Sequence, residues 1–136
     1  MPTIMTGDNV RLYYEEAGSG DTILFLHEFG GHYLSWESQI RYFSRRYRVV
    51  TWNYRGYPPS EVPKEPAAYS IEILVDDLRG LLEHLGIRRA HVGGLSLGGG
   101  VTVNFGIRHP DLAASLIICG AGHDAIPRGW QLALAA

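Results

Sequence analysis

The residues with the clearest chemical potential lie in the stretch Gly94-Leu95-Ser96-Leu97-Gly98. A serine with a glycine two positions before it and two after it has the spacing of a nucleophile carried on a sharp turn from a strand into a helix. Such a turn strains the serine backbone, and side chains in place of Gly94 and Gly98 would collide with the neighbouring elements. The helix that begins after Ser96 would aim its N-terminal amides at the hydroxyl, so the Leu97 N–H is a candidate oxyanion donor. The pattern predicts a nucleophilic serine.

The same pentapeptide has a second explanation. The chain contains 17 glycines, so the spacing arises by chance, and a serine in a tight turn can serve only as a helix cap. The surrounding pattern favours the nucleophile, because a strand is predicted over residues 90–93 and a helix over residues 99–109. The motif therefore has the context that a nucleophilic serine requires.

Strands and helices alternate along the rest of the chain. Strands are predicted over residues 9–15, 22–26, 47–52, 90–93 and 114–119, and helices over residues 35–44, 70–86 and 99–109. The best-defined helix lies between Ser70, a good N-cap, and Gly86, a C-terminal stop, because its apolar residues form one stripe. The helix over 99–109 carries apolar residues on several sides and is expected to be largely buried. The alternation predicts an α/β fold with a mostly parallel sheet and helices on both faces.

Composition narrows the class of protein. The net charge is −2 and the basic residues are scattered, so neither nucleic acid nor an acidic membrane is an expected partner. No apolar run reaches the roughly 18 residues of a membrane helix, and the N-terminus does not resemble a signal peptide. The single cysteine, Cys119, favours a cytoplasmic location. His, Cys and Asp residues lack the spacing of metal ligands, so no metal or other cofactor is expected.

A second motif follows the first buried strand: His27-Glu28-Phe29-Gly30-Gly31. Together with the serine motif it resembles the alpha/beta-hydrolase superfamily, in which this loop usually reads His-Gly-x-Gly-Gly. The resemblance implies that the Phe29 backbone N–H is the second oxyanion donor and that Gly30 and Gly31 support the loop. His27 is interpreted as a structural histidine that orders the loop. Glu28 replaces a glycine, and its carboxylate would oppose a developing negative charge unless it is paired or points away.

Further stretches resemble the same family. The segment Asn53-Tyr54-Arg55-Gly56-Tyr57-Pro58-Pro59-Ser60 is similar to the family pattern Asp-x-Arg-Gly-x-Gly-x-Ser, with Asn53 and Pro58 in place of aspartate and glycine. The resemblance implies that these residues shape a loop beside the site. It also implies that the chain is the N-terminal part of the alpha/beta-hydrolase fold, with about six strands and three main helices, in one truncated domain over residues 1–136.

A serine nucleophile needs an acid and a histidine, which follow it in chain order in this family. Downstream of Ser96, only His123 and Asp124 lie in a loop expected at the same edge of the sheet. Asp124 is a candidate acid, although a polar turn is the favoured interpretation, and residues 125–136 are expected to begin a lid segment. The last strand, 114–119, would be an open apolar edge prone to self-association.

These features favour a serine hydrolase that acts on a small-molecule ester, lactone or activated carbonyl through an acyl-enzyme on Ser96. Within the family that the chain resembles, Ser96 argues against epoxide hydrolases and haloalkane dehalogenases, which carry aspartate at this turn. It is greatest to small carboxylesterases, enol-lactone hydrolases and C–C hydrolases. The alternative is an inactive fragment or a non-catalytic binding or assembly protein. A dinucleotide-binding domain is disfavoured, because Gly93–Gly98 lacks the G-x-G-x-x-G spacing.

Overall fold

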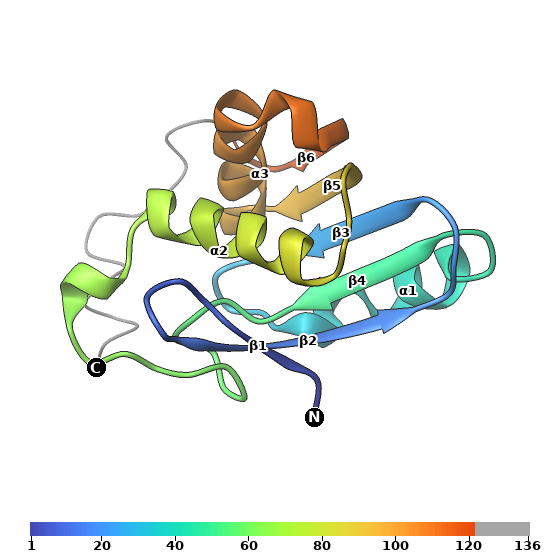
Figure 1. The fold of residues 1–136 in the computed structure, drawn as a ribbon. Helices are drawn as coiled ribbons and strands as arrows, with labels where there is room; N and C mark the ends of the chain where they lie inside the picture. Colours follow the sequence, from blue (N-terminus) through green and yellow to red (C-terminus); the bar gives the residue numbers. More distant parts are fainter. Residues whose placement is uncertain (122–136) are drawn as a thin grey trace.

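The computed structural model describes residues 1–121, which form a six-stranded sheet flanked by three α-helices (Figure 1). The strands are β1 (Thr3–Met5), β2 (Arg11–Ala17), β3 (Thr22–Leu26), β4 (Arg48–Trp52), β5 (Ala90–Leu95) and β6 (Ala113–Cys119). The helices are α1 (Glu37–Phe43), α2 (Ile71–His84) and α3 (Leu97–Arg108), with 3-10 turns at Tyr33–Trp36, Pro66–Ala68 and Pro110–Leu112. The predicted α/β class is confirmed, whereas strand β1 was not among the predicted strands.

The strand order is β1-β2-β4-β3-β5-β6. Strands β4, β3, β5 and β6 run parallel to one another, whereas β1 and β2 form an antiparallel edge. Helices α2 and α3 cover the face that Figure 1 presents to the viewer, and α1 lies behind the sheet. This mostly parallel sheet with helices on both faces is the predicted architecture. The loops that follow β3, β4 and β5 all leave from the carboxyl edge of the sheet, where sites form in such folds.

Strand β3 lies between β4 and β5, and all five of its residues are buried. Leu24 and Leu26 join the larger core, which includes residues of α2 and α3. Ile23 and Phe25 face the opposite side, where the Phe25 ring stacks on Trp36 with centroids 4.4 Å apart. Because each buried large apolar side chain contributes about 1.5–3 kcal/mol, this strand fixes the position of the loop that follows it.

Helix α2 begins and ends as its cap residues predict. The Ser70 hydroxyl accepts a hydrogen bond from the Ile73 amide at 3.1 Å, and Gly86 adopts a φ of +68° just beyond the C-cap. A left-handed residue at this place favours glycine. The apolar stripe packs into the larger core through Leu74, Val75, Leu78, Leu81 and Leu82.

Helix α3 is largely buried, as its sequence predicts, because its first half and Phe105 are buried. Val103 is half-buried, and the Ile107 side chain is 63% exposed. The buried side of the helix packs on β5, β6 and α2.

Strand β6 forms the outer edge of the sheet among residues 1–121. Leu116, Ile117 and Ile118 are 38%, 45% and 43% exposed. The expectation of an exposed apolar edge strand is therefore confirmed within the described part of the chain.

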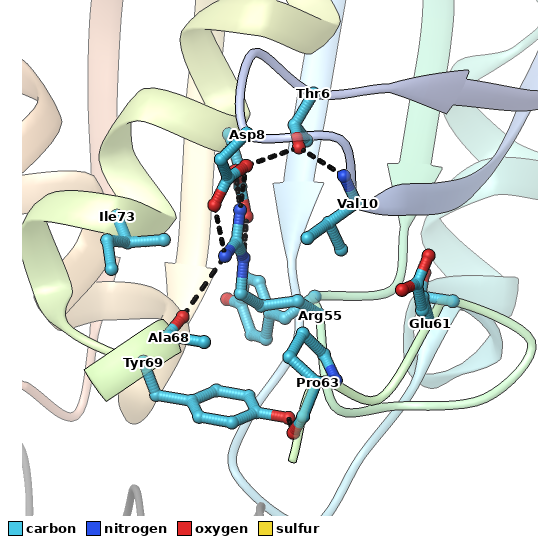
Figure 2. A network of polar contacts seen from close by, with 12 residues as sticks. Thr6, Asp8, Val10, Arg55, Glu61, Pro63, Ala68, Tyr69 and Ile73 are labelled. Atoms are coloured by element: carbon cyan, nitrogen blue, oxygen red, sulfur yellow. Dashed lines mark hydrogen bonds and ion pairs between the residues drawn. The ribbon is translucent and has the colours of Figure 1, made fainter. Parts of the chain in front are cut away.

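A buried arginine ties the hairpin turn before β2 to the body of the domain (Figure 2). The Arg55 side chain is 1% exposed, and its guanidinium donates to both oxygens of Asp8, at 2.8 and 2.9 Å. It also donates to the Ala68 carbonyl at 3.1 Å, while Thr6 donates to Asp8 at 2.5 Å. The hydrogen bonds from Arg55 lower the pKa of Asp8 to about 2, so its carboxylate stays charged.

Candidate active site

Ser96 lies at the junction between β5 and α3, in a conformation that serine rarely adopts. Its φ of 54° and ψ of −113° are the backbone angles of a sharp turn, and the residue is exposed. Such a conformation costs about 1–3 kcal/mol and persists only where the surrounding structure enforces it. Part of that enforcement comes from β6, because the Ser96 amide donates to the Cys119 carbonyl at 2.9 Å.

The two motif glycines allow the turn to close. A Cβ atom on Gly94 would lie 2.0 Å from the Gly98 carbonyl oxygen. A Cβ atom on Gly98 would lie 2.2 Å from the Leu26 carbonyl oxygen and 2.9 Å from that of His27. Both clashes involve backbone atoms that cannot easily move. The contact of Gly98 with residues 26 and 27 also brings the start of α3 against the loop that follows β3.

Leu97 is the first residue of α3, and its side chain is 1% exposed. The first amides of a helix have no partner within the helix and carry the positive end of its dipole. The Leu97 amide therefore lies beside Ser96 where an anion would be stabilised, although its role as an oxyanion donor stays a prediction.

His27 orders the loop after β3 from a buried position. Its side chain is 1% exposed, Nδ1 donates to the Glu28 carbonyl at 2.8 Å, and Nε2 accepts from the Tyr54 amide at 3.5 Å. Burial lowers the pKa of His27 to about 4, so the ring is neutral near pH 7. Both ring nitrogens are therefore engaged with backbone groups, which agrees with a structural histidine.

The Glu28 carboxylate is paired within its own loop. Its Oε1 accepts a hydrogen bond from the Ser35 hydroxyl at 2.7 Å, and it lies over Gly31, where an added Cβ atom would overlap it. Gly31 also closes the turn by donating its amide to the Glu28 carbonyl at 3.0 Å. A Cβ atom on Gly30, by contrast, would meet nothing within 4 Å. Either of two conditions makes Glu28 compatible with an oxyanion site: its carboxylate is paired, or it points away. The hydrogen bond from Ser35 meets the first.

Phe29 lies at the exposed tip of this loop, with its side chain 37% exposed. Its carbonyl accepts a hydrogen bond from the Tyr57 hydroxyl at 2.7 Å. Among residues 1–121, neither the Phe29 amide nor the Gly30 amide donates to another protein group. Within the described residues these two amides therefore have no protein acceptor, and the role of the Phe29 amide as an oxyanion donor stays a prediction.

The loop after β4 holds the first loop in place through Asn53, which is fully buried. Its Oδ1 accepts from the Tyr33 amide at 2.6 Å, and its Nδ2 donates to the Tyr57 and Pro58 carbonyls at 3.2 and 3.0 Å. An aspartate here could not donate to those carbonyls. The sequence assigned this segment a structural role but did not indicate the Tyr57 hydroxyl, since its contact with Phe29 spans 28 positions.

The histidines of residues 1–121 all make contacts away from Ser96. His32 accepts from the Leu34 amide, and His91 lies 2.7 Å from the Ser115 hydroxyl. The remaining two have aromatic neighbours, His84 beside Tyr14 and His109 beside Phe105. The candidate acid Asp124, with His123 and the expected lid segment 125–136, lies outside the described residues.

No three His, Cys, Asp or Glu side chains in residues 1–121 lie close enough together to hold a metal ion. No helix in the same range is long and apolar enough to cross a membrane.

Comparison with known proteins identifies the family. A family model described as the alpha/beta hydrolase fold matches residues 21–134. The chain therefore belongs to the alpha/beta hydrolase fold family, which confirms the resemblance seen in its motifs.

Individual relatives are similar over most of this chain. Mouse epoxide hydrolase 3 is 34% identical over 111 residues, which make up 80% of this chain and 30% of that protein. A Bacillus megaterium epoxide hydrolase, solved with an inhibitor, matches with a TM-score of 0.82 and 33% identity over 86% of this chain and 41% of that chain. An enol-lactonase from Burkholderia xenovorans LB400 matches with a TM-score of 0.79 and 32% identity, over 85% of this chain and 45% of that chain. The chain thus spans less than half the length of these relatives.

Proposed function

We propose that this chain supplies the nucleophile and oxyanion donors of a serine hydrolase that acts on an ester, lactone or other activated carbonyl. Ser96 Oγ attacks the carbonyl carbon, its proton passes to a base, and the alcohol leaves as the acyl group becomes bonded to Ser96. Water then hydrolyses the acyl-enzyme. The amides of Phe29 and Leu97 stabilise the oxyanion of each tetrahedral intermediate. In this proposal, the base and its orienting acid lie outside residues 1–121.

One observation carries the proposal. Ser96 is exposed, has a φ of 54° and lies at the carboxyl edge of the sheet, where Gly98 contacts the backbone of residues 26 and 27. A serine that served only as a helix cap would accept a hydrogen bond from the first turn of the helix. Ser96 makes no such side-chain bond to α3. Its strained geometry instead supports a role in which the hydroxyl faces a substrate.

The chemistry of a serine nucleophile favours a carbonyl substrate over an epoxide, although several relatives are named epoxide hydrolases. A carboxylate that opens an epoxide forms an ester, which water can cleave at its carbonyl carbon. A serine that opened an epoxide would form an ether, which has no carbonyl and resists hydrolysis. In this chain the turn between β5 and α3 carries serine, so a turnover cycle through Ser96 requires an acyl intermediate. The enol-lactonase match agrees with this substrate class.

The experiment is active-site labelling of the natural protein, with any further sequence that it carries. A fluorophosphonate probe should label Ser96, as located by mass spectrometry of the modified peptide. Ser96→Ala should lose labelling and about 10⁴–10⁶-fold in kcat on p-nitrophenyl acetate. Ser115→Ala is the matched control, because this serine lies on β6 and bonds to His91 on β5, and the variant should keep both labelling and kcat. A folded protein that is not labelled at Ser96 would refute the proposal, as would turnover of styrene oxide but of no ester.

A non-catalytic assembly role is the second candidate, and the exposed apolar residues of β6 favour it. An open strand edge is a template for pairing with another chain. Size-exclusion chromatography with light scattering tests this role. A concentration-dependent dimer that Ile117→Lys converts to a monomer would support it, and a monomer at all concentrations would exclude self-association through β6.

A further inference from the structure

We infer that Tyr57 is a positioning residue for the oxyanion site: its hydroxyl fixes the peptide plane between Phe29 and Gly30 and so presents the Gly30 amide to the substrate, next to the Phe29 amide, whose own peptide is held by His27 and Gly31. The inference rests on the proposed function and extends it, because it assigns a role to a side chain outside both sequence motifs. Tyr57 itself does not contact the reacting atoms.

The first step concerns the peptide between Glu28 and Phe29. The Glu28 carbonyl accepts hydrogen bonds from His27 Nδ1 at 2.8 Å and from the Gly31 amide at 3.0 Å. In a trans peptide the N–H points opposite to the carbonyl. The Phe29 amide therefore points away from the His27 ring.

The second step concerns the next peptide, between Phe29 and Gly30. Its carbonyl accepts from the Tyr57 hydroxyl at 2.7 Å, and the Tyr57 ring lies 4.7 Å from the His27 ring, centroid to centroid. Both carbonyls are thus turned toward one aromatic cluster. The amides of Phe29 and Gly30 are turned away from that cluster, and neither has a protein partner in residues 1–121.

The third step is that the orientation of the peptide between Phe29 and Gly30 depends on the hydrogen bond from Tyr57. Gly30 has open space around it, so sterics alone do not hold the peptide in one orientation. Tyr57 is itself fixed, since its amide donates to the Tyr54 carbonyl at 3.1 Å and its carbonyl accepts from Asn53. Burial, with the nearby Glu28 carboxylate, raises the pKa of Tyr57 above its ordinary value of 10.0. The hydroxyl therefore remains a proton donor throughout the working pH range of a hydrolase.

Loss of this hydroxyl would weaken transition-state stabilisation more than substrate binding. Donors that must reorganise during the reaction stabilise an oxyanion less than preorganised ones do. For Tyr57→Phe in the natural protein, kcat on p-nitrophenyl acetate should fall about tenfold or more, below the 10²–10³-fold loss expected for removal of a donor. The KM should stay within about twofold. Affinity for phenylboronic acid, which forms a tetrahedral adduct on a serine, should fall by the same factor as kcat/KM.

The matched control is Tyr69→Phe. Tyr69 is more deeply buried than Tyr57, and its hydroxyl also donates to a backbone carbonyl, that of Pro63 at 2.7 Å, but this bond lies near the loop that precedes α2. Tyr69→Phe should lose at least as much thermal stability as Tyr57→Phe, and only Tyr57→Phe should lose kcat and boronate affinity.

Each outcome decides a separate point. If Ser96 is labelled by the fluorophosphonate but Tyr57→Phe keeps kcat and boronate affinity within twofold, the inference is overturned and the proposed function stands. Equal losses of kcat in both tyrosine variants would also overturn it, since they would show a general effect of stability. If the wild-type protein is not labelled at Ser96, the proposed function and this inference fail together.

Discussion

The guanidinium of Arg55 donates two hydrogen bonds to the carboxylate of Asp77, from Nε at 2.7 Å and from Nη2 at 2.8 Å. Both side chains are almost completely buried, at 1% and 3% exposure. Arg55 comes from the loop after β4 and Asp77 from the middle of α2, so the pair joins the site edge of the sheet to its longest helix. Burial raises the pKa of Asp77 to about 6, which still leaves this carboxylate charged at pH 7.

Replacement of Arg55 should therefore destabilise the fold strongly. Arg55→Met leaves Asp77 buried without its partner, which typically costs about 3–5 kcal/mol. Chemical denaturation at pH 7 measures this loss. Arg79→Met is the control, because Arg79 and Glu83 are exposed and 3.8 Å apart, and an exposed pair contributes at most about 1 kcal/mol. Equal stability of the two variants would contradict the structural role of the buried pair.

His27 should make stability depend on pH. The native state keeps this ring neutral down to about pH 4, whereas the unfolded chain protonates it near pH 6.5. The unfolded state binds more protons in that window, so stability should fall as the pH drops from about 6.5 to 4, by up to about 3 kcal/mol from this residue.

The measurement is urea unfolding of wild type and His27→Gln at several pH values between 7 and 4. Glutamine can still donate to the Glu28 carbonyl but does not titrate. The difference in stability between the two proteins should shrink as the pH falls. A constant difference would show that the pKa of His27 is the same in the native and unfolded states and would contradict the prediction.

Gly94 and Gly98, the glycines two positions before and after Ser96, should not tolerate substitution by alanine. Gly98→Ala places a methyl group 2.2 Å from the Leu26 carbonyl oxygen, so the start of α3 must shift away from β3. Labelling of Ser96 by a fluorophosphonate should become at least tenfold slower, because the hydroxyl moves relative to the amides that stabilise the adduct.

Gly80→Ala is a matched control within α2. An added methyl group there meets nothing within 4 Å, and alanine is favoured over glycine in a helix by roughly 0.5–1 kcal/mol. This variant should be slightly more stable and should react at the wild-type rate. Normal labelling of Gly98→Ala would mean that the close packing of the elbow is not needed for reactivity.

The hydrogen bond from Ser35 pairs the Glu28 carboxylate but does not neutralise it, so its remaining charge should reduce oxyanion stabilisation. Glu28→Gln removes the negative charge while keeping an oxygen that can accept from Ser35. We expect kcat/KM to rise several-fold at low ionic strength and less at high salt, because salt screens the charge. Glu28→Asp, which keeps the charge, is the comparison. A lower kcat/KM in Glu28→Gln would instead assign the carboxylate a favourable role.

Local sequence patterns predicted the elements that are buried or capped by their own residues. Strand β3 has the predicted bounds of 22–26, because a strand buried on both faces is a continuous apolar run. Helix α2 follows from the Ser70 cap. Strand β1 has three residues, too few for a periodic pattern, and it forms because all three pair with residues of β2. The first helix was predicted over 35–44, whereas a 3-10 turn capped by His32 precedes α1, and histidine is not a common cap.

The candidate site likewise has features that local sequence predicts and others that it does not. Ser96, Leu97 and the glycines are recognised because the turn imposes its requirements on adjacent positions. The hydrogen bond from Tyr57 to Phe29 and the pairing of Glu28 with Ser35 depend on how separate loops meet, so no local spacing indicates them. Asn53 shows where prediction of the site from sequence alone ends. Its departure from the family pattern is visible in the sequence, but the two donated bonds that aspartate could not make are seen only in the folded structure.

The bond from the Ser96 amide to the Cys119 carbonyl extends the hydrogen bonding between β5 and β6 to the backbone of the proposed nucleophile. The loop that carries Phe29, in contrast, follows β3. A displacement of β6 along its length would therefore change the distance between the Ser96 hydroxyl and the Phe29 amide.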